Sequence, residues 1–482
     1  MLGVLTQQPF DLNTQPSQAV VRLPYLQNVQ SDRATIMWAA QGEGKAYVEY
    51  TRQGKPVERV AASSRAVSRS GDAPSFTQYA AQLRRLAPNS VYSYRVIADQ
   101  KEIGAEQSFQ TAGSGAFRFV AFGDSGQNTM AQSRIASRLT LEPAALVIHT
   151  GDIAYYQGTF GEFQRNYFDY YARAMARVPF FTTPGNHDYG TGDLAAYLTV
   201  HTLPTDTVPA SERGRYYSFD WNNVHFISLD SNLSLERAVS GDGGMLKWLE
   251  RDLRSTRQFW RVAFFHHAPY AGGPYLRDQN SIRARQYLTP ILEAHRVQVV
   301  LNGHEHSYQR TADVRAGSLA PAGTGTVYVT TGGGGADLYD VIPTPQVVSG
   351  ASRNHYMTID VDGPRMTLRA ISDDGVQIDA LTLSPAPSLS GDPATAVNVE
   401  QDSAGFLIRV RGWNLASQET FVGSPPFPDQ LSGVTVRVNG KAIPLIYASG
   451  TEIYGEAPPS LASVFELAVV TPNGTVSTTV ER

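Results

Sequence analysis

Five continuous apolar runs in the middle of the chain constrain its fold more than any other feature. They read FRFVAF, ALVIH, PFFT, RVAFF and VQVVL, and helical patterns such as AQSRIASRL and MLKWLERDLRS lie between them. Continuous apolar runs are typical of strands buried on both faces, and alternation with helices favours layered α/β packing. We therefore predict an α/β domain over residues 114–384, in which RYYSFDWNNVHFISLDS adds a hairpin.

Short alternating runs on both sides of this region predict two further domains. Residues 18–113 contain ATIMWAA, AYVEYTR and SVYSYRVIA, which indicate an all-β sandwich. After the Pro/Ser-rich stretch LSPAPSLSGDPAT, residues 388–482 contain GFLIRVRGW and VTVRVNG, with hairpin signals at VNG and TPNG. The second domain resembles a small immunoglobulin-like domain. In the first, LAPNSVYSYRV resembles the fibronectin type III pattern, and Trp38 is expected in its core.

Composition excludes several classes of protein. The 482 residues carry a net charge of −4 and 42% hydrophobic residues, which indicates a globular chain with no sign of a nucleic-acid-binding surface. There is no cysteine, so disulfides, thiolate catalysis and cysteine-bound metals are excluded. No apolar run approaches the roughly 20 residues that a membrane-spanning helix needs. The first residues, MLGVLTQQPF, lack the basic start of a signal peptide.

Each of the five apolar runs ends on side chains that can bind a metal. Because ligands collect at the carboxyl ends of strands in open α/β sheets, these ends are expected to form one site. The candidates are Asp124, Asp152 with Tyr155 three residues on, Asn186 with His187, His266 with His267, and His304 with His306. Each motif alone has a plain structural explanation, such as a turn or a buried histidine. Their recurrence at five successive strand ends favours a metal site.

The types of donor indicate which metals would bind. Carboxylate, imidazole, amide and phenol groups suit iron, manganese or zinc. There are more of them than one tetrahedral zinc requires, so two metals are the simpler interpretation. Asp152 could bridge the two ions because a carboxylate has two oxygens. The other five histidines lie off the pattern and are interpreted as structural: His149, His201, His225, His295 and His355.

The motif set GDSG, GDIAY, GNHD, FFHH and GHEH resembles the calcineurin-like metallophosphoesterases and, within them, the purple acid phosphatases. Gly126 stands where other metallophosphoesterases usually have a histidine, and Tyr155 stands where purple acid phosphatases have the tyrosinate that binds ferric iron. The resemblance covers residues 18–384. It implies a four-layer metallophosphoesterase sandwich of two sheets flanked by helices, preceded by the fibronectin-like domain.

The same resemblance implies roles for particular residues. Asp152 would bridge a dinuclear centre of Fe³⁺ and a divalent ion, which would be Fe²⁺, Zn²⁺ or Mn²⁺. The ferric ion would be bound by Asp124, Tyr155 and His306, and the divalent ion by Asn186, His266 and His304. His187 would contact the phosphate and help to protonate the leaving group, and His267 is the second predicted catalytic residue. His266 is preferred over His267 as ligand because the first histidine of such pairs usually binds.

Three positions depart from the family pattern. Asp188 replaces a common glutamate, Gln309 replaces the glutamate of the last motif, and no further histidine follows His267 near the substrate. Tyr275 occupies roughly the place of those histidines. The residue that protonates the leaving group is therefore left open.

The expected activity is hydrolysis of small phosphate monoesters by metal-bound hydroxide, as in an acid phosphatase. One alternative is a phosphodiesterase acting on nucleotides or lipid headgroups, and another is a non-catalytic surface adhesion protein with a degraded ligand set. By analogy with the family, the protein is expected to be bacterial and secreted or periplasmic. The sequence leaves open the physiological substrate, the divalent metal, the oligomeric state and the role of the C-terminal domain.

Overall fold

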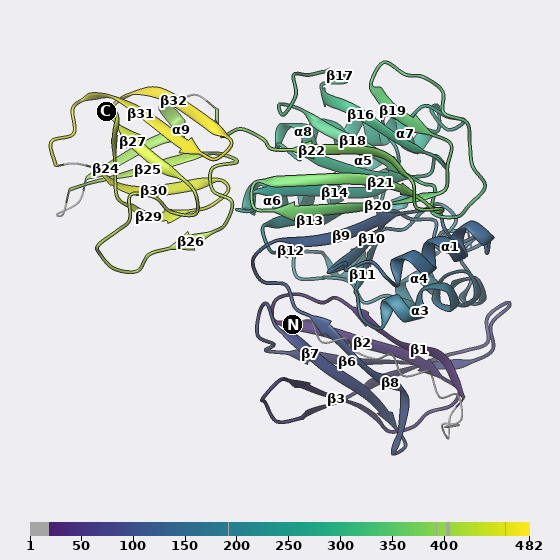
Figure 1. Ribbon diagram of the computed structural model, residues 1–482. Helices are drawn as coiled ribbons and strands as arrows, with labels where there is room; N and C mark the ends of the chain where they lie inside the picture. The colour runs from purple at the N-terminus through teal and green to yellow at the C-terminus, as the bar shows by residue number, and fades with distance from the viewer. Residues whose placement is uncertain (1–18, 191, 392, 402–404, 458) are drawn as a thin grey trace.

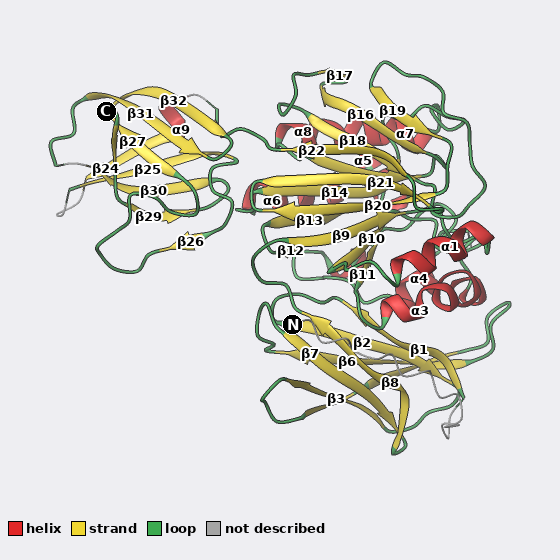
Figure 2. Ribbon diagram, in the orientation of Figure 1, coloured by secondary structure: helices red, strands yellow, loops and turns green. Residues whose placement is uncertain are grey.

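The computed structural model describes residues 19–482 except 191, 392, 402–404 and 458. Figure 1 shows three units along the chain: an N-terminal β domain, a large central domain, and a C-terminal β domain at the side of the central one. Figure 2 shows that the helices belong mainly to the central domain and lie on both sides of its paired sheets. The prediction of an α/β domain between two all-β domains is confirmed.

The N-terminal domain is a sandwich of two four-stranded sheets. Trp38 is fully buried in it and stacks on Tyr79 with ring centres 5.3 Å apart, as expected for a core tryptophan. One sheet has the order β1 (Val20–Gln27), β2 (Arg33–Ala40), β6 (Phe76–Arg84), β5 (Ser63–Val67). The other has the order β4 (Glu58–Ala61), β3 (Ala46–Arg52), β7 (Val91–Ala98), β8 (Lys101–Gln110).

The N-terminal domain shares one hydrophobic core with the central domain. The Tyr25 hydroxyl donates to the Val200 carbonyl at 2.7 Å, and the Tyr94 hydroxyl donates to the Ala176 carbonyl at 2.7 Å. The Tyr25 ring also lies 4.9 Å from the Phe168 ring. Buried tyrosines that satisfy their hydroxyls across the boundary fix the two domains against each other.

The central domain contains two sheets. The six-stranded sheet has the order β11 (Phe180–Thr182), β10 (Leu146–His149), β9 (Phe117–Phe122), β20 (His355–Asp362), β21 (Arg365–Ser372), β22 (Gln377–Leu383). The eight-stranded sheet has the order β12 (Tyr217–Trp221), β13 (Val224–Ser228), β14 (Trp260–His267), β15 (Val299–Gly303), β18 (Thr326–Thr331), β16 (Tyr308–Arg315), β17 (Ser318–Leu319), with β19 (Val347–Ala351) also paired to β16. The predicted hairpin forms β12 and β13, which pair antiparallel.

The two sheets pack face to face through aromatic side chains. Phe119 of one sheet meets Phe226 of the other edge-on at 5.1 Å, and Phe181 stacks on Phe219 at 3.8 Å. The parallel strands β9, β10 and β11 end together, as do β14 and β15. The loops that follow these five strands therefore meet at one edge of the sandwich, which is where the candidate ligands lie.

Helices flank both sheets, whereas the outer face of β21 and β22 stays partly exposed. Near the six-stranded sheet lie α1 (Met130–Leu139), α2 (Phe160–Phe163), η1 (Gln164–Phe168), α3 (Asp169–Met175) and α4 (Ala195–Val200). The remaining helices are η2 (Ala210–Glu212), α5 (Leu233–Ser240), α6 (Gly244–Ser255), α7 (Gln279–Arg283), η3 (Ala284–Leu288) and α8 (Thr289–Ala294). Two helical segments contain π-helical turns, η1 and η3, which apolar spacing does not indicate.

The C-terminal domain has a hydrophobic core separate from that of the other two domains. One sheet has the order β23 (Ser388–Leu389), β25 (Phe406–Trp413), β30 (Glu452–Ala457), β29 (Leu445–Ala448), β26 (Thr420–Phe421), with β24 (Val397–Gln401) on β25. The other has the order β28 (Lys441–Ala442), β27 (Thr435–Val438), β31 (Val464–Thr471), β32 (Gly474–Glu481), and α9 (Pro393–Ala396) precedes β24.

Candidate metal centre

The structure brings all seven predicted ligands to one place. They lie at the carboxyl ends of β9, β10, β11, β14 and β15 or in the loops that follow, and their side chains are buried except for that of Asn186, which is partly exposed. Three ligand residues hold a left-handed backbone: Asp124 at φ 57°, Asp152 at φ 53° and His304 at φ 71°. Such conformations are uncommon for residues other than glycine, and they cluster where a loop must aim a side chain at a functional site.

One group of donor atoms consists of Asp124, Tyr155 and His306. The Tyr155 hydroxyl lies 3.1 Å from His306 Nε2 and 3.4 Å from Asp124 Oδ1, and His306 Nε2 lies 3.5 Å from the same oxygen. His306 Nδ1 lies 2.6 Å from the Asp337 carbonyl. In that contact the Nδ1 proton of His306 is donated to the Asp337 carbonyl oxygen. The lone pair on Nε2 therefore faces the Asp124 carboxylate and the Tyr155 phenol.

A second group lies around His266. Its Nε2 atom is 3.0 Å from Asn186 Oδ1, 3.3 Å from Asp152 Oδ2 and 3.3 Å from His304 Nδ1. Its other ring nitrogen, Nδ1, lies 3.0 Å from the Thr150 carbonyl, which can accept its proton. Several lone pairs thus converge on one point, an arrangement that a single ring proton cannot satisfy and that a cation can.

Asp152 lies between the two groups. Its Oδ1 accepts a hydrogen bond from the His187 backbone N–H at 2.9 Å, and Asp124, Asp152 and His266 offer ligand atoms within 4.8 Å of one another. Among the described residues, no lysine or arginine forms an ion pair with either aspartate. Two buried carboxylates surrounded by imidazole and phenol groups are a donor set that fits hard or borderline cations.

The pKa values reflect this crowding. Burial alone would lower the pKa of His266, but the Asp152 and Asp124 carboxylates outweigh it and raise the pKa to about 9. Burial, reinforced by the charge of His266, lowers the pKa of His304 to about 3. Burial and the two carboxylates hold the pKa of the Tyr155 phenol well above its ordinary value. A bound cation would reverse the last effect, because it favours the ionised phenol.

Close glycines allow the loops to pack this tightly. A Cβ atom at Gly303 would lie 2.3 Å from Asp124 Oδ2 and 3.1 Å from His266 Nδ1. A Cβ atom at Gly185 would lie 2.1 Å from Asp152 Oδ1. Both glycines precede ligands in the sequence, so the motifs contain the space that the ligands occupy.

The two predicted catalytic histidines have different surroundings. The His187 side chain is 32% exposed, and its Nε2 lies 4.0 Å from Asp152 Oδ2. His267 is buried, its Nδ1 lies 2.8 Å from Ser231 Oγ, and burial with the charges of His304 and His266 lowers its pKa well below the ordinary value. His267 also offers a ligand atom near His266 and His304. The catalytic roles of both residues and the assignment of ligands to individual ions stay predictions.

Sequence reasoning missed the residues that hold these loops in place. Asp188, interpreted only as a mild departure from the family motif, accepts backbone hydrogen bonds from Gly185 at 2.8 Å, Ile153 at 3.0 Å and Ala154 at 3.2 Å. It therefore ties the loop after β11 to the loop after β10. Because Asp188 lies inside the GNHD motif, the sequence could have indicated its role. Thr150, Ser231 and Asp337 contact the site histidines through backbone carbonyl or hydroxyl groups, which no motif indicates.

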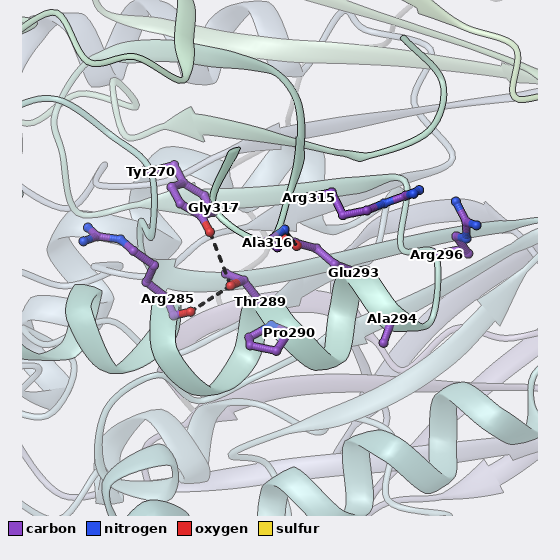
Figure 3. Close-up of a pocket in the computed structure, with 10 residues that line it drawn as sticks. All are labelled: Tyr270, Arg285, Thr289, Pro290, Glu293, Ala294, Arg296, Arg315, Ala316 and Gly317. Carbon is purple, nitrogen blue, oxygen red and sulfur yellow. Dashed lines mark hydrogen bonds between the residues drawn. The ribbon is translucent and has the colours of Figure 1, made fainter. Parts of the chain in front are cut away.

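A pocket of about 600 Å³ lies outside the metal centre and contains none of the candidate ligands (Figure 3). In it, Arg285 Nε donates to the Pro269 carbonyl at 2.6 Å, and the Tyr270 and Thr289 hydroxyls lie 3.5 Å apart. Glu293 accepts from Ala316 N–H at 2.6 Å and from the Tyr328 hydroxyl at 2.8 Å. The first two contacts hold the loop that follows β14 against η3 and α8, and the Glu293 contacts tie α8 to the turn after β16 and to β18.

The fold is that of a metallophosphoesterase. Residues 117–308 match the family model for calcineurin-like phosphoesterases, and residues 21–111 match the model for the purple acid phosphatase N-terminal domain. Together the two matches cover more than half of the chain. In its central and N-terminal domains the chain is therefore similar to the purple acid phosphatases: a calcineurin-like phosphoesterase domain follows a purple acid phosphatase N-terminal domain.

Known relatives agree with this assignment. An uncharacterized protein of Mycobacterium tuberculosis is 27% identical over 330 residues, which are 56% of this chain and 61% of the relative. Purple acid phosphatase 23 of Arabidopsis thaliana is 32% identical over 168 residues, 33% of this chain and 35% of that protein. The chain thus matches less than two thirds of the length of these relatives. A probable inactive purple acid phosphatase of the same plant is 24% identical over 64% of this chain and 59% of its own length.

Among solved structures, a purple acid phosphatase from yellow lupin seeds superposes with a TM-score of 0.68. It is 20% identical in sequence, and the match covers 76% of this chain and 75% of the lupin chain. At this level of identity the likeness shows the fold. Within the described residues, no helix has the length and apolar character needed to cross a membrane.

Proposed function

We propose that the protein is a dimetal hydrolase that cleaves phosphate monoesters, as an acid phosphatase. The observation that carries the proposal is the pair of donor groups, Asp124–Tyr155–His306 and Asn186–His266–His304, with Asp152 between them. The family implies Fe³⁺ together with Fe²⁺, Zn²⁺ or Mn²⁺. Such a pair of cations would polarise the phosphoryl oxygens and lower the pKa of water.

The chain's own residues would bind and orient the ester. The partly exposed His187 lies beside Asp152 and can reach a phosphate held at the centre. Its Nδ1 lies 3.0 Å from the Tyr156 carbonyl, which can accept that proton and fix the ring. A histidine held in this way can donate a proton to the departing alcohol.

The test compares wild type with Asp152→Ala. Metal content is measured by mass spectrometry, and turnover is measured with p-nitrophenyl phosphate and bis(p-nitrophenyl) phosphate. We expect wild type to hold two metal ions per chain and to prefer the monoester, and the variant to lose metal and activity. Wild type that binds no metal, or a variant with undiminished turnover, contradicts the proposal. A strong preference for the diester would instead support the phosphodiesterase alternative.

We also propose that the protein acts outside the cytoplasm, as a secreted or periplasmic enzyme. The support is analogy with multidomain phosphatases that carry β-sandwich domains. Fractionation of producing cells followed by immunodetection tests this proposal, and a signal confined to the cytoplasmic fraction would contradict it.

A further inference from the structure

Two tyrosines with exposed rings lie against the metal centre. The side chains of Tyr156 and Tyr275 are 58% and 40% exposed, whereas Tyr155 is buried. Tyr156 follows Tyr155 in the loop after β10, and Tyr275 lies in the loop after β14, so the two rings come from different sheets. Single exposed aromatic residues are common at protein surfaces and need no ligand to explain them. These two differ because both contact residues of the centre.

The contacts form a continuous path across the site. The Tyr156 ring lies 5.9 Å from the ring of His187, which neighbours Asp152. Asp152 contacts His266, and His266 contacts His304 at 3.3 Å. The Tyr275 ring lies 4.5 Å from the His304 ring. The donor groups are thus bordered by an aromatic ring at each end.

Both tyrosines are held by their backbones rather than left free. Tyr156 N–H donates to Glu162 Oε1 at 2.7 Å, and Tyr275 N–H donates to Glu305 Oε1 at 2.8 Å. Glu162 also closes the capping box of α2, and Glu305 lies between two metal-ligand candidates. These bonds fix the backbone from which each ring projects, and a tyrosine side chain has only two torsions to order when a flat group packs on it.

The loops beside the centre expose apolar side chains together with the charged side chains of Asp337, Asp340 and Arg277. The loop that supplies the Asp337 carbonyl to His306 also carries Leu338 and Ile342, whose side chains are 36% and 49% exposed. Among the described residues, no lysine or arginine forms a hydrogen bond with a predicted ligand or with His187. The part of a substrate that projects from the metals would therefore meet the two tyrosine rings among mixed apolar and charged side chains.

We propose that Tyr156 and Tyr275 bind the leaving group, and that the preferred substrates are phosphate esters whose alcohol carries a planar aromatic ring. This inference rests on the proposed phosphoester hydrolysis. A planar ring packs against tyrosine faces by offset or edge contacts, which a saturated ring of similar size makes less well. The two tyrosines therefore determine specificity and take no part in proton transfer.

The test uses two esters that differ only in aromaticity: 2-phenylethyl phosphate and 2-cyclohexylethyl phosphate. Their leaving alcohols have similar acidity, so a difference in kcat/KM reports binding rather than chemistry. We expect metal-loaded wild type to favour the phenyl ester by roughly twofold to tenfold. Tyr275→Leu and Tyr156→Leu should bring the ratio toward one, mainly through KM, and Tyr275→Phe and Tyr156→Phe should keep it.

Tyr287→Leu is the matched control, since Tyr287 is 39% exposed but lies on η3, outside the metal centre. This substitution should leave the ratio of kcat/KM for the two esters unchanged. The metal content of every variant is also measured, because a misfolded variant would lose its metal. A wild-type ratio of one, or a ratio that survives both leucine substitutions, overturns the inference while leaving the phosphatase proposal intact. If metal-loaded wild type hydrolyses neither ester nor p-nitrophenyl phosphate, both the function and this inference fall.

Discussion

His266 Nε2 lies 3.3 Å from Asp152 Oδ2, although the two residues are 114 positions apart in the chain and are positioned by strands of different sheets. The contact joins the loop after β10, in the six-stranded sheet, to the end of β14, in the eight-stranded sheet. The metal centre therefore depends on how the two sheets pack. Changes that alter this packing by less than an ångström should be visible in metal affinity.

Gly303→Ala tests the packing directly. The new Cβ atom would lie 2.3 Å from Asp124 Oδ2, so the carboxylate or the β15 backbone must move. Substitutions of residues that hold metal ligands in place typically lower metal affinity by roughly 10- to 100-fold. We expect a loss of that order in Gly303→Ala. Chelator competition measures it. Gly423→Ala is the control, since its Cβ would meet only Phe421 at 3.7 Å, and equal affinity in both variants would contradict the prediction.

Tyr155→Phe should remove colour without unfolding the protein. The hydroxyl lies 3.1 Å from His306 Nε2 and 3.4 Å from Asp124 Oδ1, where an ion could bind all three. If the family resemblance holds, protein loaded with ferric iron absorbs visible light through the tyrosinate. The variant should lose this band while its circular dichroism spectrum stays unchanged. A band that persists in the variant would show that another group causes the colour.

His225 makes stability depend on pH in the alkaline range. It is buried between Asp220, 2.6 Å from Nδ1, and Asp252, 2.8 Å from Nε2. Burial opposes its charge, but the two carboxylates outweigh burial and raise the pKa to about 9. Because the folded pKa lies above the unfolded value of about 6.5, the stabilisation is fully present below pH 6.5 and disappears as pH rises through 9.

The measurement is Tm between pH 6 and pH 10 for wild type and His225→Gln. Wild type should lose Tm across the upper part of this range, and the variant should start lower and change less. Parallel curves for the two proteins would show that His225 is not the group responsible. His225 lies on β13 and not in the loops that hold the candidate metal ligands, so no variant of the metal centre is needed for this comparison.

Arg261 is a buried cation at the boundary with the C-terminal domain. Its guanidinium lies 4.6 Å from the Trp413 ring, and its side-chain nitrogens have no hydrogen-bond partner among the described residues. Burial lowers its pKa to about 9, with the Asp220 charge opposing the shift. Replacing a buried charge by an apolar side chain of similar length is often neutral or stabilising by about 1–4 kcal/mol.

We therefore expect Arg261→Met to keep or raise the Tm of the intact chain. Trp413→Ala should lower it, because the substitution removes the ring that packs on the guanidinium. Differential scanning calorimetry on both variants separates the two effects. A large loss of stability in Arg261→Met would mean that the guanidinium has a favourable partner, such as ordered water, in solution.

Removal of residues after 387 should leave phosphatase activity in place. The C-terminal domain has its own hydrophobic core, and its contacts with the central domain lie at residues such as Asn223, Arg257 and Gln298 rather than at the ligand loops. We expect the shortened chain to bind metal and hydrolyse p-nitrophenyl phosphate at a rate within about twofold of the full chain. Complete loss of activity in a folded protein would show that the C-terminal domain supports the centre.

Much of the fold follows from local patterns. The continuous apolar runs became β9, β10, β11, β14 and β15, because strands buried on both faces need apolar side chains at every position. Most of the short alternating runs became strands of the two flanking β domains with one solvated face, whereas ATIMWAA became β2, which is buried on both faces. The π-helical turns were missed because they depend on how α2–α3 and α7–α8 adapt to their neighbours.

The sequence by itself determined which side chains could bind metal, since each lies at a strand end and glycines make room beside it. Only the tertiary structure decided how these donors divide into two groups about Asp152, which carbonyl orients each histidine, and that Asp188 ties two loops together. The physical reason is range. Strand formation depends on neighbours along the chain, whereas the distance from His266 to Asp152 depends on the packing of two separate sheets.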